Sequence, residues 1–368
     1  MNIHLTSQTK RQSSQKANLI KLAVDVHARS YSVVRQVDNA RMQPPQSFTP
    51  ERFVLWAGRQ KEQADRIVVC YESGPFGFVL ARQLLAMGVE CLVMAAQQLD
   101  ERKKGVQTDE LDALEIASRL DRYLAGNTKA MAIVKIPTLE QERERSEARQ
   151  RQQLLKTRKQ LEAQGRSLLV LNGYFQAPSH WWKAPLWDMG QKQWPQPVVQ
   201  MLERWRTVLL QVEEQLRSLT RKLESSLKQY LPKSMPHLPI GTGALSWVLL
   251  SREILDWKRF DNRQQVGSFA GLVASESSSG QQRRQGHITK VGNPRVRAIV
   301  VEMIWRLINF QPDYWVVKKW LPLLNRSSRS ARKKIIIAMS RQCCVDLWRL
   351  GSGATTAQAL GLRVATPV

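Results

Sequence analysis

Four acidic residues in the first third of the chain have the types and spacings needed to hold divalent metal ions. Asp25 lies inside the apolar run Leu22–Val26, where an uncompensated carboxylate would be costly to bury. Glu72 directly follows another apolar run. Asp109 and Asp112 are three positions apart, so on a helix both would project from the same face. A bound cation would compensate charges that converge in this way.

The chemistry that such a cluster supports is metal-dependent phosphoryl transfer. Converging carboxylates repel one another unless they hold a cation, and Mg²⁺ prefers carboxylate oxygens while leaving positions for water and phosphate. Each residue also has a structural interpretation: Asp109 could cap its helix, Asp112 could face solvent, and Asp25 could accept from backbone amides. The joint order of a strand Asp, a strand-end Glu and a helical Asp-x-x-Asp pair favours an RNase H-like nuclease site using Mg²⁺ or Mn²⁺.

A second candidate site lies in a serine-rich segment near the other end of the chain. Residues 275–280 hold four serines and a glycine, which predicts a flexible polar loop. The segment that follows carries residues that could clamp a phosphate: Arg283, Arg284, His287 and Lys290. A serine hydroxyl attacks weakly without a base, metal or cation, and no His/Asp pair stands beside these serines. Activation would therefore have to come from elsewhere in the fold.

The elements that must position the carboxylates are predicted to form an α/β sheet. Apolar runs between polar breaks predict strands, and apolar residues at helical spacing predict helices. The expected order is a hairpin of Leu22–Val26 and Tyr31–Val37, a strand Ile67–Tyr71, a helix Phe76–Met87, a strand Glu90–Met94 and an amphipathic helix Asp109–Leu120. This domain is expected to span residues 18–137, after a basic disordered arm at residues 1–17.

The middle of the chain, residues 138–232, is predicted to be a helical coiled-coil linker. Residues 138–164 are dense in Arg, Glu and Gln, which suits a long solvated helix. From Leu202 to Leu223 large apolar residues alternate spacings of three and four, as in a coiled-coil seam. We expect the two helices to pair or dimerise. The segment 174–197 between them carries four tryptophans that could stack on bases or cover the helices, and packing is favoured.

The last part of the chain, residues 233–368, is expected to be mainly helical and to face DNA. Basic segments around Arg295–Arg306 and Arg326–Arg341 suit helices that contact phosphates. The turn Pro239–Gly243 would open another helix, whose backbone N–H groups could grip a phosphate.

Composition points to a nucleic-acid partner. Lys and Arg total 56 against 31 Asp and Glu, a formal net charge of +25 that would attract a polyanion. The 368 residues allow two or three domains. No apolar run approaches the roughly 18 residues needed to span a bilayer, so no membrane span and a cytoplasmic location, on the nucleoid when DNA is bound, are expected. The four cysteines lack metal-binding spacing and are expected to be buried, reduced thiols.

Two sets of segments, in this order along the chain, carry a resemblance to a known family. The first set is Ala23-Val24-Asp25, Tyr71-Glu72-Ser73-Gly74 and Thr108–Ala113. The second is Arg259, Gly271-Leu272-Val273, Ser279-Gly280, Arg284, Gly286, Ile288–Lys290 and Gly292-Asn293. Together they resemble the RuvC-like motifs and the transposase domain of the DEDD transposases in the insertion-sequence family numbered one hundred and ten, relatives of the Piv and MooV DNA invertases.

This resemblance implies a mechanism and partners. It implies a RuvC-like domain whose Asp25, Glu72, Asp109 and Asp112 hold Mg²⁺, and a C-terminal domain whose Ser279 becomes covalently joined to DNA, with Ser277 and Ser278 as neighbouring alternatives. It implies a noncoding bridge RNA that pairs with target and donor DNA, and a homodimer that assembles into a tetramer. The nucleic-acid contacts expected on this basis and from the charge pattern are Arg283, Arg284, His287, Lys290, Asn293 and Arg295.

Three functions follow from these observations. The leading hypothesis is an RNA-guided recombinase that inserts and excises its element by serine attack on DNA phosphodiesters. The second is a RuvC-type junction nuclease that uses water, which predicts that Ser279→Ala still cleaves DNA. The third is a catalytically inactive nucleic-acid-binding relative, which predicts salt-sensitive binding and no product.

Overall fold

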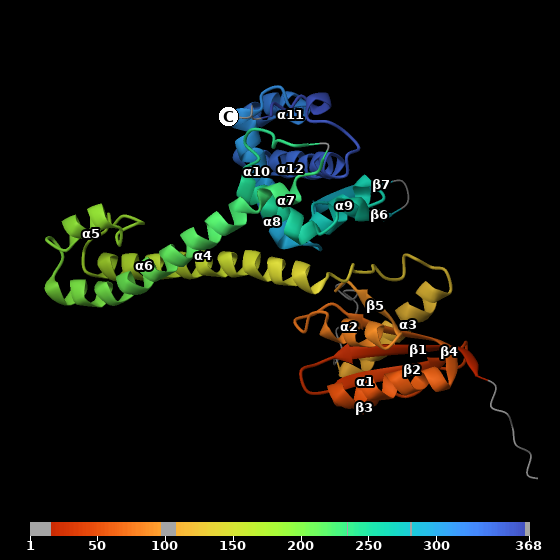
Figure 1. Cartoon of the computed structure of the whole chain (residues 1–368). Coiled ribbons are helices and arrows are strands. Elements are labelled where there is room, and N and C mark those ends of the chain that lie inside the picture. The colour runs from red at the N-terminus through yellow and green to blue at the C-terminus, as the bar shows by residue number, and fades with distance from the viewer. Residues whose placement is uncertain (1–15, 97–107, 234, 280–281, 365–368) are drawn as a thin grey trace, which may run out of the picture. The chain divides into compact units, whose positions relative to one another are not determined.

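The computed structural model describes residues 16–96, 108–233, 235–279 and 282–364, together with the side chains of these ranges except at positions 276–285 (Figure 1). The chain divides into two compact units, Met1–Pro137 and Thr138–Val368. The basic arm expected at residues 1–17 lies, except for its last two residues, outside the described residues.

Unit 1 is built on a five-stranded sheet in the order β3-β2-β1-β4-β5. Strands β1 (Ala17–Val26), β2 (Tyr31–Val37) and β3 (Gln46–Phe48) are antiparallel neighbours. Strand β4 (Ala64–Glu72) runs parallel to β1, and β5 (Glu90–Met94) runs parallel to β4. The predicted hairpin and the predicted strand, helix, strand order are confirmed, and β1 is central in the sheet.

Helices cover both faces of this sheet. Strand β3 is followed by helix α1 (Pro50–Arg59) and the short η1 (Gln60–Glu62). Strand β4 is followed by α2 (Val79–Ala86), and β5 by α3 (Asp109–Leu124). Val24 packs in a cluster with side chains of α1 and α2, whereas Ala23 packs in another with side chains of α3. Because side chains alternate along a strand, Asp25 shares the face of Ala23 and therefore lies on the α3 side.

Unit 2 begins with two long helices, α4 (Leu139–Leu171) and α6 (Gln196–Ser225), which pack antiparallel as an arm. The Arg158 guanidinium donates to Glu213 at 2.9 Å, and seven residues away on each helix Arg151 donates to Thr220 at 2.8 Å. The seam of α6 is used within the chain, since Leu202 and Leu209 are buried in the same cluster as Leu169 of α4.

The tryptophan-rich segment, which includes α5 (Ala184–Gly190), packs onto this helical arm. All four of its tryptophans are buried: Trp181, Trp182, Trp187 and Trp194. Two indoles donate to Glu162 of α4, Trp181 to its carbonyl at 3.0 Å and Trp182 to its carboxylate at 2.9 Å. A Cβ at Gly165 would lie 2.0 Å from the Trp181 ring, so only glycine permits this approach. Packing, the favoured interpretation, is confirmed.

The rest of unit 2 is mainly helical around one apolar core. Its elements are α7 (Leu227–Tyr230), α8 (Ala244–Ile254), η2 (Trp257–Arg259), α9 (Arg263–Ala270), β6 (Ala274–Ser279), β7 (Gln282–Ile288), α10 (Pro294–Phe310), α11 (Trp315–Arg326), α12 (Arg329–Gly351) and η3 (Gln358–Leu360). All four cysteines are buried and free, as predicted. Within the described ranges, no helix is both long enough and apolar enough to cross a membrane.

The serine-rich segment corrects one prediction. We expected a flexible polar loop, but residues 274–279 form strand β6, which pairs antiparallel with β7. Ser277 pairs with Arg284 and Ser279 with Gln282. The prediction relied on the low strand propensity of serine. It was wrong because the partner strand supplies hydrogen bonds to the backbone N–H and C=O groups whatever the side chains are.

Candidate functional site

Asp25 and its neighbours form an acidic cluster at the end of β1. The Asp25 side chain is 18% exposed, and its Oδ2 lies 3.3 Å from Nδ1 of His27. The same imidazole nitrogen lies 3.9 Å from Oδ2 of Asp109 at the start of α3. These three residues offer ligand atoms that all lie within 4.8 Å of one another. The spacing is suited to a shared cation.

Glu72 reaches the same cluster from β4. Val24 of β1 pairs with Tyr71 of β4, so Asp25 and Glu72 are the next residues along two adjacent parallel strands. Burial raises the pKa of Glu72; the charge of Arg119 lowers it, while Asp112 and Asp25 raise it further. Two of the other predicted carboxylates therefore lie within electrostatic range of Glu72.

The pKa of Asp25 is raised in the same way. Burial is the largest cause that raises its pKa, and Asp109 and Asp112 add to the rise, while the charge of His27 opposes it. The structure thus places the ligand atoms of Asp25 and Asp109 together with His27, and Glu72 and Asp112 within electrostatic range of Asp25. The net effect of their environment is to disfavour ionised Asp25 and Glu72.

Two carboxylate oxygens of this cluster have no hydrogen bond from the described residues. Oδ2 of Asp25 and Oδ1 of Asp112 are both buried and accept no hydrogen bond there, although Nδ1 of His27 lies 3.3 Å from Oδ2 of Asp25. Buried carboxylate oxygens are normally hydrogen-bonded or coordinate a metal. The orphaned oxygens, together with the hard oxygen donors around them, fit a divalent cation such as Mg²⁺.

The start of α3 shows why the two helical aspartates point into the cluster. Thr108 is the N-cap, and its hydroxyl accepts from the backbone N–H of Leu111. Capping by Asp109, the structural interpretation of that residue, is therefore wrong. Ala113 and Ile116, on the same helix face one turn further along, are buried against the sheet and so turn Asp109 and Asp112 towards it.

His27 is a site residue that the sequence reasoning missed. We assigned it no role; it lies between the two strands of the predicted hairpin. The signal was available: His27 is two residues beyond Asp25, and residues two apart in extended chain project to the same side. Its imidazole could bind a metal or accept a proton beside the carboxylates.

The proposed nucleophile lies in the second unit. Ser279 is the last residue of β6, opposite Gln282, and the side chains of both, like those of Arg283 and Arg284, lie outside the described side chains. Ser275, at the other end of β6, donates from its Oγ to the carbonyl of His287 at 2.9 Å. His287 and Lys290 are exposed at the base of the hairpin.

Asn293 and Arg295, both predicted to contact nucleic acid, have partners within the protein. Oδ1 of Asn293 accepts from the backbone N–H groups of Arg295 and Val296 and so caps α10. Its Nδ2 donates to Glu253 at 2.8 Å. The Arg295 guanidinium donates to Gln152 of α4 at 2.9 Å. The Asn293 amide is therefore engaged at both ends, which suits a positioning role.

Glu253 is the centre of a cationic cluster that the sequence gave no sign of. Its buried carboxylate accepts from Nε and Nη2 of Arg149 at 3.1 and 3.2 Å, and Nη2 of Arg145 lies 3.7 Å away. Burial alone would raise the pKa of Glu253, but Arg149, Asn293 and Arg145 together hold it below its usual value. Burial of the Arg259 guanidinium and the charge of Arg145 lower the pKa of Arg259 to about 10.

Comparison with known proteins gives one family match, which lies in the second unit, and two similar proteins. Residues 239–316 match the family described as "Transposase IS116/IS110/IS902 family". The protein named "Putative transposase y4qE" of Sinorhizobium fredii (strain NBRC 101917 / NGR234) is 27% identical over 251 residues, which are 66% of this chain and 58% of that protein. "Putative transposase y4rJ" of the same organism is 26% identical over 330 residues, 77% of this chain and 76% of that protein.

The chain is thus similar in part to transposases, and within residues 239–316 to the IS116/IS110/IS902 family. The alignment spans 58% of the length of the first of the two relatives. The family match covers β6, β7, Asn293 and most of the helices around them, so it includes the candidate serine but not the acidic cluster of unit 1.

Proposed function

We propose that the protein is the transposase of an insertion sequence, a site-specific DNA recombinase that joins its serine to DNA while a metal-binding carboxylate cluster assists. The observation that carries this proposal is the convergence of Asp25, Glu72, Asp109 and Asp112 with two orphaned carboxylate oxygens, in a chain whose second unit matches a transposase family. The mixed sheet that holds these residues supports an RNase H-like, RuvC-like assignment for unit 1.

The carboxylate cluster and the serine would have separate roles in this reaction. The four carboxylates, with His27 beside them, would hold Mg²⁺ or Mn²⁺, which supplies Lewis-acid stabilisation of charge on the scissile phosphate. The Ser279 hydroxyl forms a new bond to phosphorus as the bond from phosphorus to the leaving strand oxygen breaks, and the serine proton passes to that oxygen. Attack by the hydroxyl of another strand then releases the serine and completes the exchange.

Basic side chains would hold the DNA while this happens. Arg283, Arg284, His287 and Lys290 belong to β7 and the segment after it, on the hairpin that carries Ser279. Contacts of this kind fix the position of a phosphate backbone without reading its sequence. Arg295 would add a contact at the start of α10, and Asn293 would hold that helix start in place through its cap and its bond to Glu253.

Sequence choice would come from RNA. We include in the proposal a noncoding bridge RNA from the same element, which pairs with donor and target DNA. The net charge of +25 exceeds what a few DNA contacts need and suits a complex that holds RNA and DNA together.

Assembly into a dimer and then a tetramer is also proposed, because recombination joins four DNA ends. The coiled-coil seam of α6 packs inside the chain, so the contact between copies would use other faces. Met201 and Val208, seven residues apart on one side of α6, are 42% and 43% exposed and offer one such apolar surface.

A covalent-adduct assay tests the proposal. Purified protein, the RNA flanking its element, Mg²⁺ and end-labelled donor and target DNA are combined and run on denaturing gels. We expect a protein–DNA band that Ser279→Ala and Asp109→Ala both abolish and that requires RNA. Ser277→Ala and Ser278→Ala locate the nucleophile. Ser275→Ala is the matched control. It removes the hydrogen bond from Ser275 Oγ to the carbonyl of His287 and should retain the protein–DNA band.

One observation favours a second function, the RuvC-type junction nuclease. His27 lies beside Asp25 and Asp109, where it could accept a proton from an attacking water, so unit 1 holds a set of groups sufficient for hydrolysis. Cleavage by Ser279→Ala without any adduct would establish this function. Salt-sensitive binding with no product under any metal condition would instead establish the inactive relative.

A further inference from the structure

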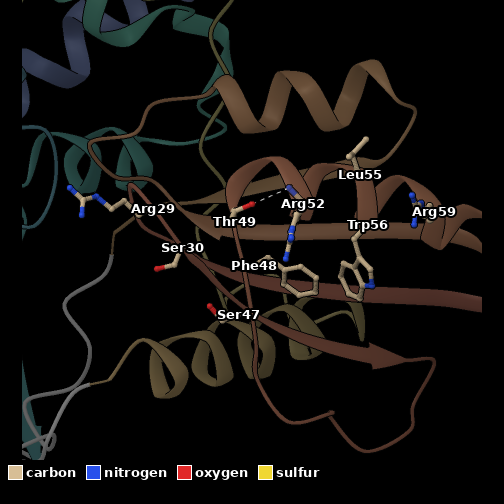
Figure 2. A pocket seen from close by; sticks show the side chains of 9 residues that line it. All are labelled: Arg29, Ser30, Ser47, Phe48, Thr49, Arg52, Leu55, Trp56 and Arg59. Carbon is tan, nitrogen blue, oxygen red and sulfur yellow. Dashed lines mark hydrogen bonds between the residues drawn. The ribbon is translucent and has the colours of Figure 1, made fainter.

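A cavity of about 490 Å³ opens on unit 1, apart from the acidic cluster. Its walls come from the turn after β1, from β3 and from one side of α1 (Figure 2). The residues that matter for its chemistry are Arg29, Phe48, Thr49, Arg52, Trp56 and Arg59. Three cations, two aromatic rings and a hydroxyl on one short stretch of surface are the components of a nucleotide site.

The three arginines of this cavity are exposed, and none has a hydrogen bond or ion pair to a side chain in the part of the chain that the structure describes. Other arginines of the same unit are engaged. Arg35 donates to two glutamines, and Arg66 donates to Glu90 at 2.9 and 3.1 Å. The guanidinium groups at the cavity are therefore available for an anion from outside.

The two aromatic rings are held in place from behind. Phe48 and Trp56 lie 4.8 Å apart between ring centroids at 35°, and both pack against the apolar cluster under α1. Figure 2 shows Arg52 extending beside Phe48, with Trp56 next to it and Arg29 and Arg59 at opposite ends of the cavity. Rigid aromatic faces flanked by cations are the arrangement on which unstacked bases bind.

The cavity lies at the same end of the sheet as the carboxylates. Asp25 pairs with Ser32 across β1 and β2, and Ser32 pairs with Ser47 of β3, which lines the cavity. Two strand spacings separate Asp25 from Ser47, about 10 Å. Arg29 and Ser30 lie in the turn that begins immediately after His27. Phe48 and Trp56 pack on the α1 face of the sheet whereas Asp25 lies on the α3 face, so the turn that holds His27 and Arg29 is what connects the cavity with the acidic cluster.

We infer that this cavity binds a nucleotide of single-stranded nucleic acid, with its base stacked on Trp56 and Phe48 and its flanking phosphates held by Arg29, Arg52 and Arg59. Bases in a duplex are stacked on their neighbours and do not present a face to a protein ring, so the site selects unpaired nucleotides. This inference rests on the proposed function only in taking nucleic acid as the substrate. It would hold a displaced DNA strand or an unpaired RNA segment on unit 1.

Binding is measured by fluorescence anisotropy with the full-length protein in EDTA, so that no cleavage occurs and a failure of catalysis does not affect the result. The probes are labelled oligo(dT) and oligo(U) of about 12 nucleotides and a duplex of equal length. Trp56→Ala should weaken single-strand binding roughly tenfold and leave duplex binding unchanged. Trp56→Phe, which keeps an aromatic face, should retain most of the affinity.

Arg52→Ala should reduce the slope of log affinity against log salt for single strands by about 0.7, the value for one lost phosphate contact. Arg41→Ala, an exposed arginine in the loop between β2 and β3, is the matched control and should leave the slope unchanged. Comparison of the two oligonucleotides shows whether the occupant is RNA or DNA.

Ultraviolet crosslinking of oligo(U) followed by peptide mapping provides a readout that does not depend on the folding of any variant. We expect the crosslink within residues 46–59. Single-strand binding that is unaffected in both Trp56→Ala and Arg52→Ala would overturn the inference. So would equal losses for duplex and single strands, or a crosslink that maps only to other segments.

Discussion

Two carboxylate sites in this protein are both at least partly buried, but their surroundings shift the carboxylate pKa values in opposite directions. Glu253 of unit 2 is buried among arginines, and the balance of its environment holds its pKa below the usual value. The pKa values of Asp25 and Glu72 of unit 1 are raised, mainly by burial and further by neighbouring carboxylates, although His27 and Arg119 oppose the rise. At the first site the positive charges outweigh the effect of burial, whereas at the second they do not.

The difference shows how structural and ligand-binding carboxylates can be separated. A buried acid that the fold supplies with arginines contributes to the fold, because removing either partner leaves an uncompensated charge. A cluster of acids with orphaned oxygens costs stability until a cation binds. Substitution at the two sites should therefore have opposite consequences for activity and for stability.

The largest expected effect is on catalysis at the acidic cluster. Glu72→Gln should lower the rate of DNA cleavage by about a thousandfold or more, because a metal ligand worth several kcal/mol in the transition state is lost. Single-turnover cleavage of labelled DNA measures the rate. The matched control is Glu90→Gln, a surface residue of the neighbouring strand paired with Arg66, which should cleave normally. Equal rates for Glu72→Gln and wild type would remove Glu72 from the active site.

The next largest effect is on folding at the arginine-bound site. Glu253→Gln should destabilise unit 2 by about 3 kcal/mol, the low end for a buried pair, since it removes the counter-charge of the largely buried Arg145 and of the partly exposed Arg149. Chemical denaturation monitored by circular dichroism measures the loss. Glu203→Gln, which breaks an exposed pair with Arg206, should change stability by no more than about 1 kcal/mol. Similar losses for the two variants would show that the Glu253 cluster is no more important than a surface pair.

The same variant makes a prediction about pH. A carboxylate whose folded pKa lies below its ordinary value of 4.5 adds stability that is present above that value and is lost as pH falls through it. The stability difference between wild type and Glu253→Gln should therefore be constant near neutral pH and shrink below about pH 4.5. Unfolding midpoints measured from pH 7 down to pH 3 test this. A gap that widens on acidification would contradict the direction of the shift.

The contrast between the two sites also explains what could be predicted from the sequence. The acidic cluster depends on local signals: Asp25 within an apolar run, Glu72 at the end of another, and Asp109 with Asp112 on one helix face. Strand and helix order then brings them together. The Glu253 cluster depends on residues distant in sequence, with Arg149 104 positions and Asn293 40 positions away. No periodicity connects residues at such separations, so only the folded chain reveals them.

Strand β6 was missed for a related reason. Its serines have no apolar alternation, and its pairing with β7 depends on backbone hydrogen bonds that leave no pattern in the side chains. His27 was overlooked because a polar break was interpreted as a connector, although its position two residues beyond Asp25 placed it on the same side of the chain. Local patterns therefore identified the main carboxylates but not the groups beside them.

The smallest expected effect is the most direct test of the contrast. Asp25→Asn removes a charge that the fold disfavours, so in EDTA the variant should melt a few degrees higher than wild type, by roughly 2–5 °C. Mg²⁺ should raise the melting temperature of wild type, because a ligand that binds only the folded state stabilises it, and should have little effect on Asp25→Asn. Differential scanning fluorimetry with and without Mg²⁺ measures both shifts. Asp25→Asn could instead melt lower than wild type in EDTA and respond to Mg²⁺ like wild type. Asp25 would then be stabilised by the protein's own groups, and both carboxylate sites would be structural.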